Sequence, residues 1–253
     1  MENITSIERM GFIMSGQLMN QGKDKFNVPA GKSKISGTLY LYRTDARITF
    51  KVKGKAKNAS WTNFSFEPRG YRVLNIPQTT YVFSHEEDAQ SDYGHMTQLL
   101  TFDNLNVTSS DGIYSSFDFY LQENRQNPMK KIKDDSWNVE GVDASQSQET
   151  GLFVLREEWN GYYEEGDKSQ QKKFIFAPQN GTYVEIKGLL SYQDETKNPV
   201  EFVSADVTYT IHLGNTGQYN TDINNYATER NTHYTYNVTV RGIDDIVVEV
   251  EED

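Results

Sequence analysis

The stretch RNTHYTYNVTVRG, residues 230–242, constrains the fold more than any other part of the chain, because it alternates without a break. One parity carries large apolar or aromatic residues: Tyr234, Tyr236, Val238 and Val240. The other parity is polar: His233, Thr235, Asn237, Thr239 and Arg241. Successive side chains of a strand point to opposite faces of its sheet. The stretch therefore predicts a strand with one buried face and one solvated face.

The same alternation recurs along the chain. Residues of one parity between 46 and 52 are apolar: Ala46, Ile48, Phe50 and Val52. A further series shares one face between 203 and 213: Val203, Ala205, Val207, Tyr209, Ile211 and Leu213. Leu39 and Leu41 lie on the parity opposite to Ala46, so a bulge near Arg43 and Thr44 would be needed to turn both groups inward.

Many short strands separated by Gly, Pro and Asn turns, with little helical periodicity, are typical of β-sandwiches. Residues 125–148 are charged and polar and predict a linker or long surface loop, whereas residues 152–159 fit either a short helix or a strand. A chain of 253 residues is long enough for two ordinary domains. We therefore predict an all-β chain of two antiparallel β-sandwich domains in tandem, residues 1–140 and 141–253.

Composition excludes several classes of function. The absence of cysteine rules out thiol catalysis, disulfides and cysteine-ligated zinc. A net charge of −11 argues against nucleic-acid binding, which usually needs a basic face. No run reaches the roughly 18 apolar residues of a membrane span. The first residues lack the basic and apolar blocks of a signal peptide, so an exported protein would be present here in a mature or trimmed form.

The candidate chemical sites are weak. His212 and His233 are expected at solvent-side positions of adjacent strands, but a zinc site needs three or four ligands and no third is evident, so ordinary surface histidines are favoured. The acidic loop between His85 and His95 predicts a solvated hairpin tip rather than a metal site or an acid–base pair. Residues 214–225 offer oxygen ligands for calcium without EF-hand spacing. We expect no catalytic residue, no metal and no cofactor.

Residues 202–250 resemble the C-terminal region of fimbrillins, the subunits of Bacteroidales type V pili. The resemblance consists of a strand ending in Leu-Gly, a connection rich in Asp and Asn, an Arg-Asn pair and a strand close to V-T-V-x-G. The matching residues are Arg230, Asn231, Tyr234, Tyr236, Val238, Val240 and Gly242. A second segment, LYRTDARITF, resembles a strand of the family's N-terminal domain, with Thr44 departing from the usual apolar residue. Its motif-strand residues are Arg43, Ala46, Arg47, Ile48, Thr49 and Phe50.

Three further segments, VLNIPQTTYV, FYLQENRQ and FAPQNGTYVEIKG, also resemble parts of the family and follow in the expected order. The resemblance implies transthyretin-like sandwiches, export to the cell surface at the outer membrane, and assembly with other pilus subunits by donor-strand exchange. The family continues beyond its final strand, whereas this chain stops at Asp253. It is therefore a shortened form, a variant whose last strand lies elsewhere, or a subunit whose C-terminal sandwich lacks its last strand. Related stalk subunits lose an N-terminal segment after an arginine, a role that Arg9 matches only loosely.

The leading hypothesis is a non-enzymatic structural or accessory subunit of a fimbrium (pilus) that acts in cell adhesion. Its partners would be other pilus subunits and surface ligands of host or bacterial cells. The alternative is a tip adhesin or carbohydrate-binding module, with Trp61, Trp137 and Trp159 as candidate aromatic contacts, although Trp61 is expected in the core because it lies within a strand. The third hypothesis is a hydrolase built on a sandwich. It ranks lowest, because no nucleophile, base and orienting group can be named in the sequence.

Overall fold

The computed structural model describes residues 13–19, 22–23, 31, 37–83, 93–110, 112–125, 132–133, 138–139, 180–214 and 226–252. These residues form strands and connections, without a helix. The strands are β1 (Met14–Met19), β2 (Thr38–Arg43), β3 (Asp45–Gly54), β4 (Trp61–Leu74), β5 (Ile76–Pro77), β6 (Tyr93–Gly94), β7 (Asn104–Ser109), β8 (Gly112–Gln122), β9 (Ile132–Lys133), β10 (Asn138–Val139), β11 (Tyr183–Asp194), β12 (Glu201–His212), β13 (His233–Val240) and β14 (Ile246–Glu252).

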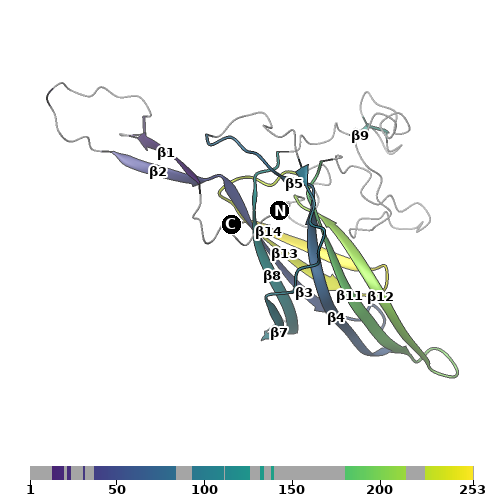
Figure 1. The fold of residues 1–253 in the computed structure, drawn as a ribbon. Coiled ribbons are helices and arrows are strands. Elements are labelled where there is room, and N and C mark those ends of the chain that lie inside the picture. Colours follow the sequence, from purple (N-terminus) through teal and green to yellow (C-terminus); the bar gives the residue numbers. More distant parts are fainter. Residues whose placement is uncertain are drawn as a thin grey trace.

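Two sheets form a sandwich (Figure 1). One contains five strands in the order β14-β13-β3-β8-β7, and the other contains three in the order β12-β11-β4. The prediction of an all-β sandwich is confirmed. The sheets are antiparallel as predicted except at one pair, because β13 lies parallel to β3. Every other pair of named strands is antiparallel.

The core lies between the two sheets and is built by the apolar parity of each strand. On β3 the residues Ala46, Ile48 and Phe50 are wholly buried, as the alternation predicts. Aromatic rings join the two layers: Tyr71 of β4 stacks on Phe117 of β8, with ring centroids 3.7 Å apart. Burying a large apolar side chain stabilises the folded state by about 1.5–3 kcal/mol, so this layer of rings contributes strongly to holding the sheets together.

The strands of each sheet come from both sides of the predicted boundary between residues 140 and 141. β3 lies beside β13, and β4 lies beside β11. The boundary therefore does not separate the described strands, and the tandem arrangement of 1–140 and 141–253 is not confirmed. The reason is physical: alternation determines which face of a strand is buried, but not which other strand becomes its neighbour.

Individual strands were predicted with different success. The alternating segments 112–124, 203–213, 233–241 and 246–252 predict strands, and β8, β12, β13 and β14 lie there. The segments SWTNFSFEP and YRVLNIP predict two separate strands, but residues 61–74 form the single strand β4. Most of the predicted linker 125–148 and the ambiguous segment 152–159 lie outside the described residues.

β1 and β2 form a separate hairpin that projects from one end of the sandwich (Figure 1). The chain bends at Thr44, between β2 and β3. The expectation that a bulge near Thr44 would turn Leu39 and Leu41 inward is wrong. β2 leaves the five-stranded sheet and pairs with β1, so Leu39 and Leu41 are 56% and 55% exposed.

Candidate functional site

The projecting hairpin has two chemically different faces. Residues directly opposite each other in an antiparallel pair share a face, and the register places Leu18 opposite Leu39 and Gly16 opposite Leu41. One face is therefore mainly aliphatic, with Arg43 opposite Met14 at its base, and we call its apolar residues the aliphatic face of the ribbon: Met14, Gly16, Leu18, Leu39 and Leu41. The other face carries Tyr40 and Tyr42 with Ser15, Gln17, Met19 and Thr38.

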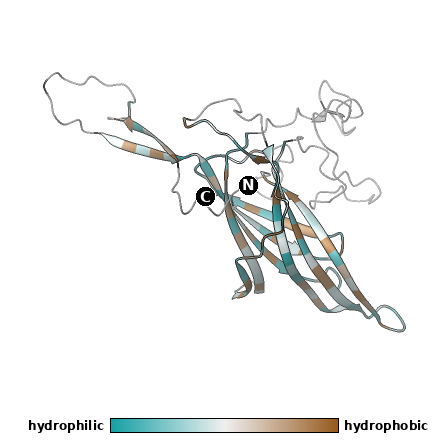
Figure 2. Ribbon diagram, in the orientation of Figure 1, coloured by the Kyte–Doolittle hydropathy of each residue, from teal (hydrophilic) through white to brown (hydrophobic). Residues whose placement is uncertain are grey.

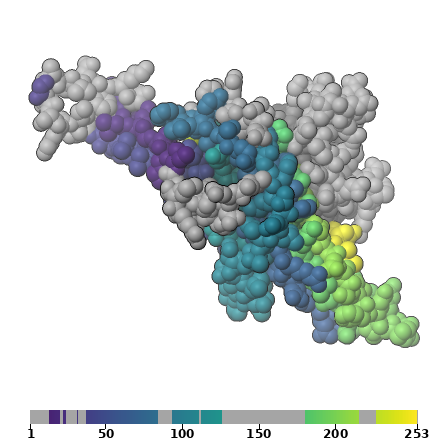
Figure 3. All heavy atoms as spheres, viewed as in Figure 1, coloured from purple at the N-terminus to yellow at the C-terminus, as the bar shows by residue number. Residues whose placement is uncertain are grey.

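The aliphatic face has the residue pattern of a sheet surface that packs on a core, yet its large side chains are exposed. Hydrophobic residues of β2 stand out in Figure 2, and atoms of the hairpin extend beyond the body of the sandwich in Figure 3. Gly16 leaves room for the side chain of Leu41 opposite it, because a Cβ at Gly16 would lie 2.8 Å from Cδ2 of Leu41. An isolated two-stranded hairpin is marginally stable in water, and contiguous exposed apolar surface marks interaction sites.

Hydrogen bonds fix the root of the hairpin to the sandwich. The backbone N–H of Thr44 donates to the carbonyl oxygen of Ile13 at 3.1 Å. Asn231 adopts a left-handed conformation with φ of 60°, its N–H donates to the carbonyl oxygen of Asp45 at 3.0 Å, and its side-chain oxygen accepts from the N–H of Arg43 at 3.4 Å. Asn tolerates positive φ better than most residues, so it suits this position. Asn231 therefore links the end of β2 and the start of β3 to the connection before β13.

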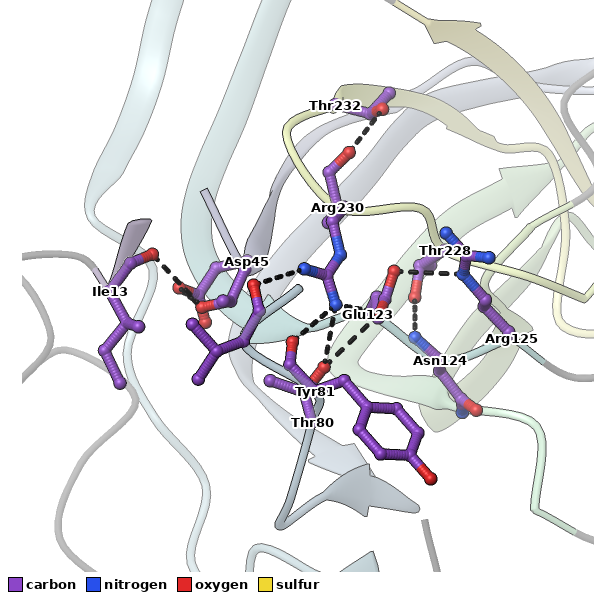
Figure 4. A network of polar contacts seen from close by, with 12 residues as sticks. Ile13, Asp45, Thr80, Tyr81, Glu123, Asn124, Arg125, Thr228, Arg230 and Thr232 are labelled. Carbon is purple, nitrogen blue, oxygen red and sulfur yellow. Dashed lines mark hydrogen bonds and ion pairs between the residues drawn. The ribbon is translucent and has the colours of Figure 1, made fainter. Parts of the chain in front are cut away.

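A buried ion pair lies next to this root (Figure 4). The guanidinium of Arg230 pairs with the carboxylate of Glu123, and both side chains are almost wholly buried. The same guanidinium donates to the carbonyl oxygens of Tyr81 at 2.7 Å and Val82 at 3.1 Å. Arg125 donates to the second oxygen of Glu123 at 3.0 Å. Arg230 therefore joins the segment after β5 to the end of β8 and to the connection before β13.

Burial and charge act in opposite directions on the carboxylates near Arg230. Burial by itself would raise the pKa of Glu123, but the hydrogen bonds and charges of Arg230 and Arg125 outweigh it and lower that pKa below its ordinary value. The pKa of Asp45 is raised, because its burial outweighs the hydrogen bond from Thr44 and the charge of Arg230. Glu123 is thus the carboxylate that the network holds ionised.

Asn124, the next residue along the chain, connects a second set of segments. Its side-chain amide donates to the hydroxyl of Thr182 at 2.8 Å and to the carbonyl oxygen of Asn180 at 2.9 Å. Its backbone exchanges hydrogen bonds with that of Thr228 at 2.9 and 3.0 Å. The Glu-Asn pair that closes the segment FYLQEN is therefore a structural junction, which the sequence alone does not reveal.

The residues that carry the sequence resemblance occupy two neighbouring strands. Ala46, Ile48 and Phe50 lie on β3, and the parallel register places Ile48 beside Tyr234 and Phe50 beside Tyr236. The buried members of this set are Ala46, Ile48, Phe50, Tyr234, Tyr236, Val238 and Val240. They are core residues. Arg230 and Asn231 hold the hairpin root, Arg43 lies exposed at the end of β2, and Arg9 lies outside the described residues.

Four strands form the outer edges of the two sheets: β14 and β7 in the five-stranded sheet, and β12 and β4 in the three-stranded sheet. An edge strand presents unpaired backbone N–H and C=O groups to which another chain can add. β12 is the longest edge without an irregularity, with 12 residues paired to β11 and no shift of register. Its end near the β11–β12 turn exposes Val200 and Phe202.

The outer face of the five-stranded sheet holds a polar hollow of about 290 Å³. Its lining combines ammonium, amide, carboxylate and aromatic groups, among them Lys51, Lys53, Tyr114, Asn237, Glu249 and Glu251. The amide nitrogen of Asn237 donates to Glu251 at 3.0 Å. Such a surface can exchange hydrogen bonds with a polar ligand, but it lacks the arrangement of nucleophile, base and orienting group that covalent catalysis requires.

The histidines are not arranged as the sequence predicts. β12 and β13 belong to different sheets. His212 is buried because the rings of Tyr183 and Tyr226 lie against it, and His233 bonds to the hydroxyl of Thr49 at 2.9 Å. His95 accepts a hydrogen bond from the N–H of Asn75, while His85 and residues 215–225 of the candidate calcium loop lie outside the described residues.

Within the ranges that the structure describes, no group of three His, Asp or Glu side chains could hold a metal ion. Trp61 is partly buried, and its ring stacks on Tyr192 with centroids 4.3 Å apart, which confirms the expectation that it packs in the core. Trp137 and Trp159 lie outside the described residues. No helix among the described residues has the length and apolar character needed to cross a membrane.

No protein-family model and no curated protein sequence matches this chain. The chain is similar in structure to the tip fimbrial protein Mfa3 from Porphyromonas gingivalis, with 10% identity and a TM-score of 0.35 over 84% of this chain and 52% of that one. It is also similar to a presumed cell adhesion protein from Parabacteroides distasonis, with 14% identity and a TM-score of 0.41 over 84% and 52%. A third similarity is to a presumed cell adhesion protein from Bacteroides eggerthii, with 13% identity and a TM-score of 0.38 over 85% and 56%.

The chain thus spans 52–56% of the length of these three proteins. Identities of 10–14% with TM-scores below 0.5 are too low to transfer a function. The function of this chain has to be inferred from its own residues.

Proposed function

We propose that this chain is a non-enzymatic structural or accessory subunit of a fimbrium, exported to the cell surface at the outer membrane, where it assembles with other subunits by strand addition. The observation that carries the proposal is the exposed aliphatic face of the β1–β2 ribbon. A sheet face of this composition stabilises a protein only when a second surface covers it. The sequence resemblance to fimbrillins supports the same function.

The hydrogen bonds at the root of the hairpin support an assembly role. Asn231 accepts from the N–H of Arg43 at the end of β2, and the buried ion pair of Arg230 with Glu123 stabilises the segments next to Asn231. A ribbon that is already ordered loses little further conformational entropy when it binds, which favours affinity. Backbone hydrogen bonds to an added strand would supply affinity, and the alternating side chains would set its register.

The proposal is tested by measuring the molar mass of the purified chain as a function of concentration, by light scattering and electron microscopy. The test variant is Leu39→Thr with Leu41→Thr, because threonine keeps the preference for strands while removing the aliphatic face. The matched control is Leu105→Thr on β7, because Leu105 is 58% exposed, close to the exposure of the two leucines. We expect wild type and control to form oligomers and the double variant to remain monomeric.

The three proteins should unfold at similar temperatures, since substitutions of exposed residues usually change stability by less than about 0.5 kcal/mol. A wild-type chain that stays monomeric over its whole soluble range, or a double variant that assembles like the control, would refute the proposal. A cytosolic location of the native protein would contradict the export that the proposal requires.

The second candidate function is a tip adhesin that binds carbohydrate, and the polar hollow on the outer face of the five-stranded sheet favours it. Tyr114 offers a ring face, and Lys51, Asn237 and Glu249 offer donors and acceptors that match sugar hydroxyls. A glycan array discriminates between the two functions. A structural subunit should give no signal, whereas an adhesin should give a signal that Asn237→Ala removes and Asn58→Ala, outside the hollow, retains.

A further inference from the structure

The backbone of β12 offers a continuous row of outward groups. The N–H of Leu213 donates to the carbonyl oxygen of Thr182 at 2.8 Å, and the register from this pair to Glu201 has no shift. In an antiparallel pair, hydrogen-bonded and non-hydrogen-bonded positions alternate. The odd-numbered residues of β12 therefore bond to β11. The even-numbered residues direct their N–H and C=O groups away from β11, where no described strand pairs with β12: Phe202, Ser204, Asp206, Thr208 and Thr210.

The two edges of the five-stranded sheet are protected against strand addition. β14 is seven residues long and carries Glu249, Glu251 and Glu252, whose charges would have to be desolvated under an added strand. β7 has a register irregularity between Asn104 and Val107, and Asn106 has a positive φ of 53°. Bulges and charges are the features by which natural sheets prevent pairing at their edges.

The remaining edge of the three-stranded sheet is also protected. Near its end β4 is covered by the segment that pairs Leu100 with Tyr71, and further back it contains Pro68 beside a shift of register. β12 has no proline and no such shift. The carboxylate of Asp206 is paired with Arg69 at 2.6 Å, which reduces the charge along the edge. Among the described strands, β12 therefore has the edge best suited to accept another strand.

The side chains of β12 indicate what kind of strand would fit. On the side that faces the core, Val203 and Ala205 are only partly buried, although Val207 and Tyr209 further along are buried. On the solvent side Phe202 is 67% exposed. An added strand with aliphatic residues on one face and aromatic or polar residues on the other would extend both surfaces. The β1–β2 ribbon has this pair of faces.

The ribbon that reaches this edge has to come from another molecule. In each chain the hairpin continues from β3 at Thr44 and projects from the sandwich on the side away from β12 (Figure 1). Its strands have six residues each, which corresponds to about 20 Å, and they would cover about half of the twelve-residue edge. A second copy of this chain supplies a ribbon of the right length and patterning without any rearrangement of the first.

We infer that the outer edge of β12 accepts the β1–β2 ribbon of a second copy of this chain, with the aliphatic face of the ribbon on the side of Val203 and Ala205. This inference rests on the proposed function and names its donor and its acceptor. Because the ribbon and the edge are different surfaces of the same chain, the contact is head-to-tail and extends into an open filament.

Disulfide trapping tests the contact directly, because the chain contains no cysteine of its own. The donors are Tyr40→Cys on β2 and Gln17→Cys, directly opposite on β1. The acceptors are Phe202→Cys, Ser204→Cys, Asp206→Cys and Thr208→Cys, each mixed separately with each donor and oxidised. The matched control is Glu249→Cys on β14. Cross-linking requires Cα atoms within about 7 Å, and a spacing of two residues along β12 samples the registers at that resolution.

We expect covalent heterodimers from one or two neighbouring β12 positions and none above background from the β14 control. A second variant, Thr208→Pro, removes one outward N–H without removing a bond to β11, as edge positions allow. We expect it to raise the concentration needed for assembly by about tenfold or more. Thr208→Ala, which keeps the N–H, should assemble like wild type. Circular dichroism and the thermal midpoint establish that both variants fold.

The outcomes separate this inference from the proposed function. If wild type assembles but β12 cysteines cross-link no better than the β14 control, and Thr208→Pro assembles like Thr208→Ala, the inference is overturned while the proposed function stands. If wild type does not assemble at all, the proposed function fails and the inference fails with it.

Discussion

Phe50 and Tyr236 lie side by side in the parallel pair of β3 and β13, with ring centroids 4.8 Å apart and ring planes within 10° of each other. Phe117 stacks on the other side of Phe50 at 4.9 Å. A residue near the start of the described sandwich therefore packs on one near its end. Pairing between strands so far apart in sequence closes a long loop, which slows folding relative to local pairing.

The hydroxyl of Tyr236 should contribute to stability through Gly214. It accepts from the N–H of Gly214 at 2.8 Å and donates to the carbonyl oxygen of the same residue at 3.1 Å, in a fully buried position. Tyr236→Phe leaves both backbone groups without this partner, so we expect a loss of about 1–3 kcal/mol in the free energy of unfolding. Urea denaturation measures it, with the exposed Tyr40→Phe as control. Equal stability of the two variants would contradict the assignment.

Arg230→Ala should be among the most destabilising substitutions in the chain. It leaves the carboxylate of Glu123 buried with Arg125 as its remaining cation and removes two hydrogen bonds to backbone carbonyls. Breaking a buried pair in this way costs about 3–5 kcal/mol. Arg69→Ala is the control, because its pair with Asp206 is exposed and should contribute no more than about 1 kcal/mol. Similar denaturation midpoints for the two variants would show that the buried pair of Arg230 with Glu123 does not stabilise the fold more than the exposed pair of Arg69 with Asp206.

The stability contributed by Glu123 should depend on pH with a defined sign. Its pKa in the folded state lies below the ordinary value of 4.5. A carboxylate with a lowered pKa contributes stability that is present above the ordinary pKa and is lost as the pH falls through the folded-state pKa. The difference in unfolding free energy between wild type and Glu123→Gln should therefore be constant near neutral pH and shrink below pH 4.5.

Asp45 acts in the opposite direction, because its raised pKa favours the folded state as the pH falls. It is present in both proteins, so subtracting one unfolding curve from the other removes most of its effect. Denaturation across the acid range measures the difference. A gap between the two proteins that widened with acidification would contradict the lowered pKa of Glu123.

Gly188 of β11 should not tolerate a side chain. A Cβ there would lie 2.3 Å from Cε2 of Phe66 and 2.7 Å from the backbone oxygen of Glu67, at the register shift between β11 and β4. Such a glycine marks a close approach of another strand, and forcing atoms into a filled core costs about 1–3 kcal/mol. Gly242→Ala is the control, because its nearest contact, on Trp61, would be an ordinary 3.4 Å. Thermal unfolding should separate the two variants, and coincident curves would refute the predicted clash.

Leu39 and Leu41 show how far the sequence could predict the candidate site. Their parity conflicts with that of Ala46, which correctly indicates an irregularity at Arg43 and Thr44. The conflict has two solutions, a bulge that keeps the strand in its sheet or a break that releases it. Alternation cannot choose between them, because the choice depends on whether β1 or the sandwich offers β2 the better partner.

Glu123 was not predicted as a partner of Arg230, and no local signal could have identified it. The two residues are 107 positions apart and meet only because β8 and the connection before β13 end at the same corner of the sandwich. His212 illustrates the converse error. Its parity predicts exposure, but Tyr226, from outside its strand, covers its ring.

The sequence by itself determined which face of β3 and which face of β13 carries the apolar core residues, because alternation is a local property that backbone geometry imposes on each strand. It also excluded thiol chemistry and made nucleic-acid binding improbable, because these depend on composition. Only the tertiary structure decided that β3 lies beside β13, that β2 leaves the sheet and that β12 is an edge strand among the described strands. These features depend on which of several strands, far apart in the chain, pairs best with a given strand, and the alternation within one strand carries no information about its partner.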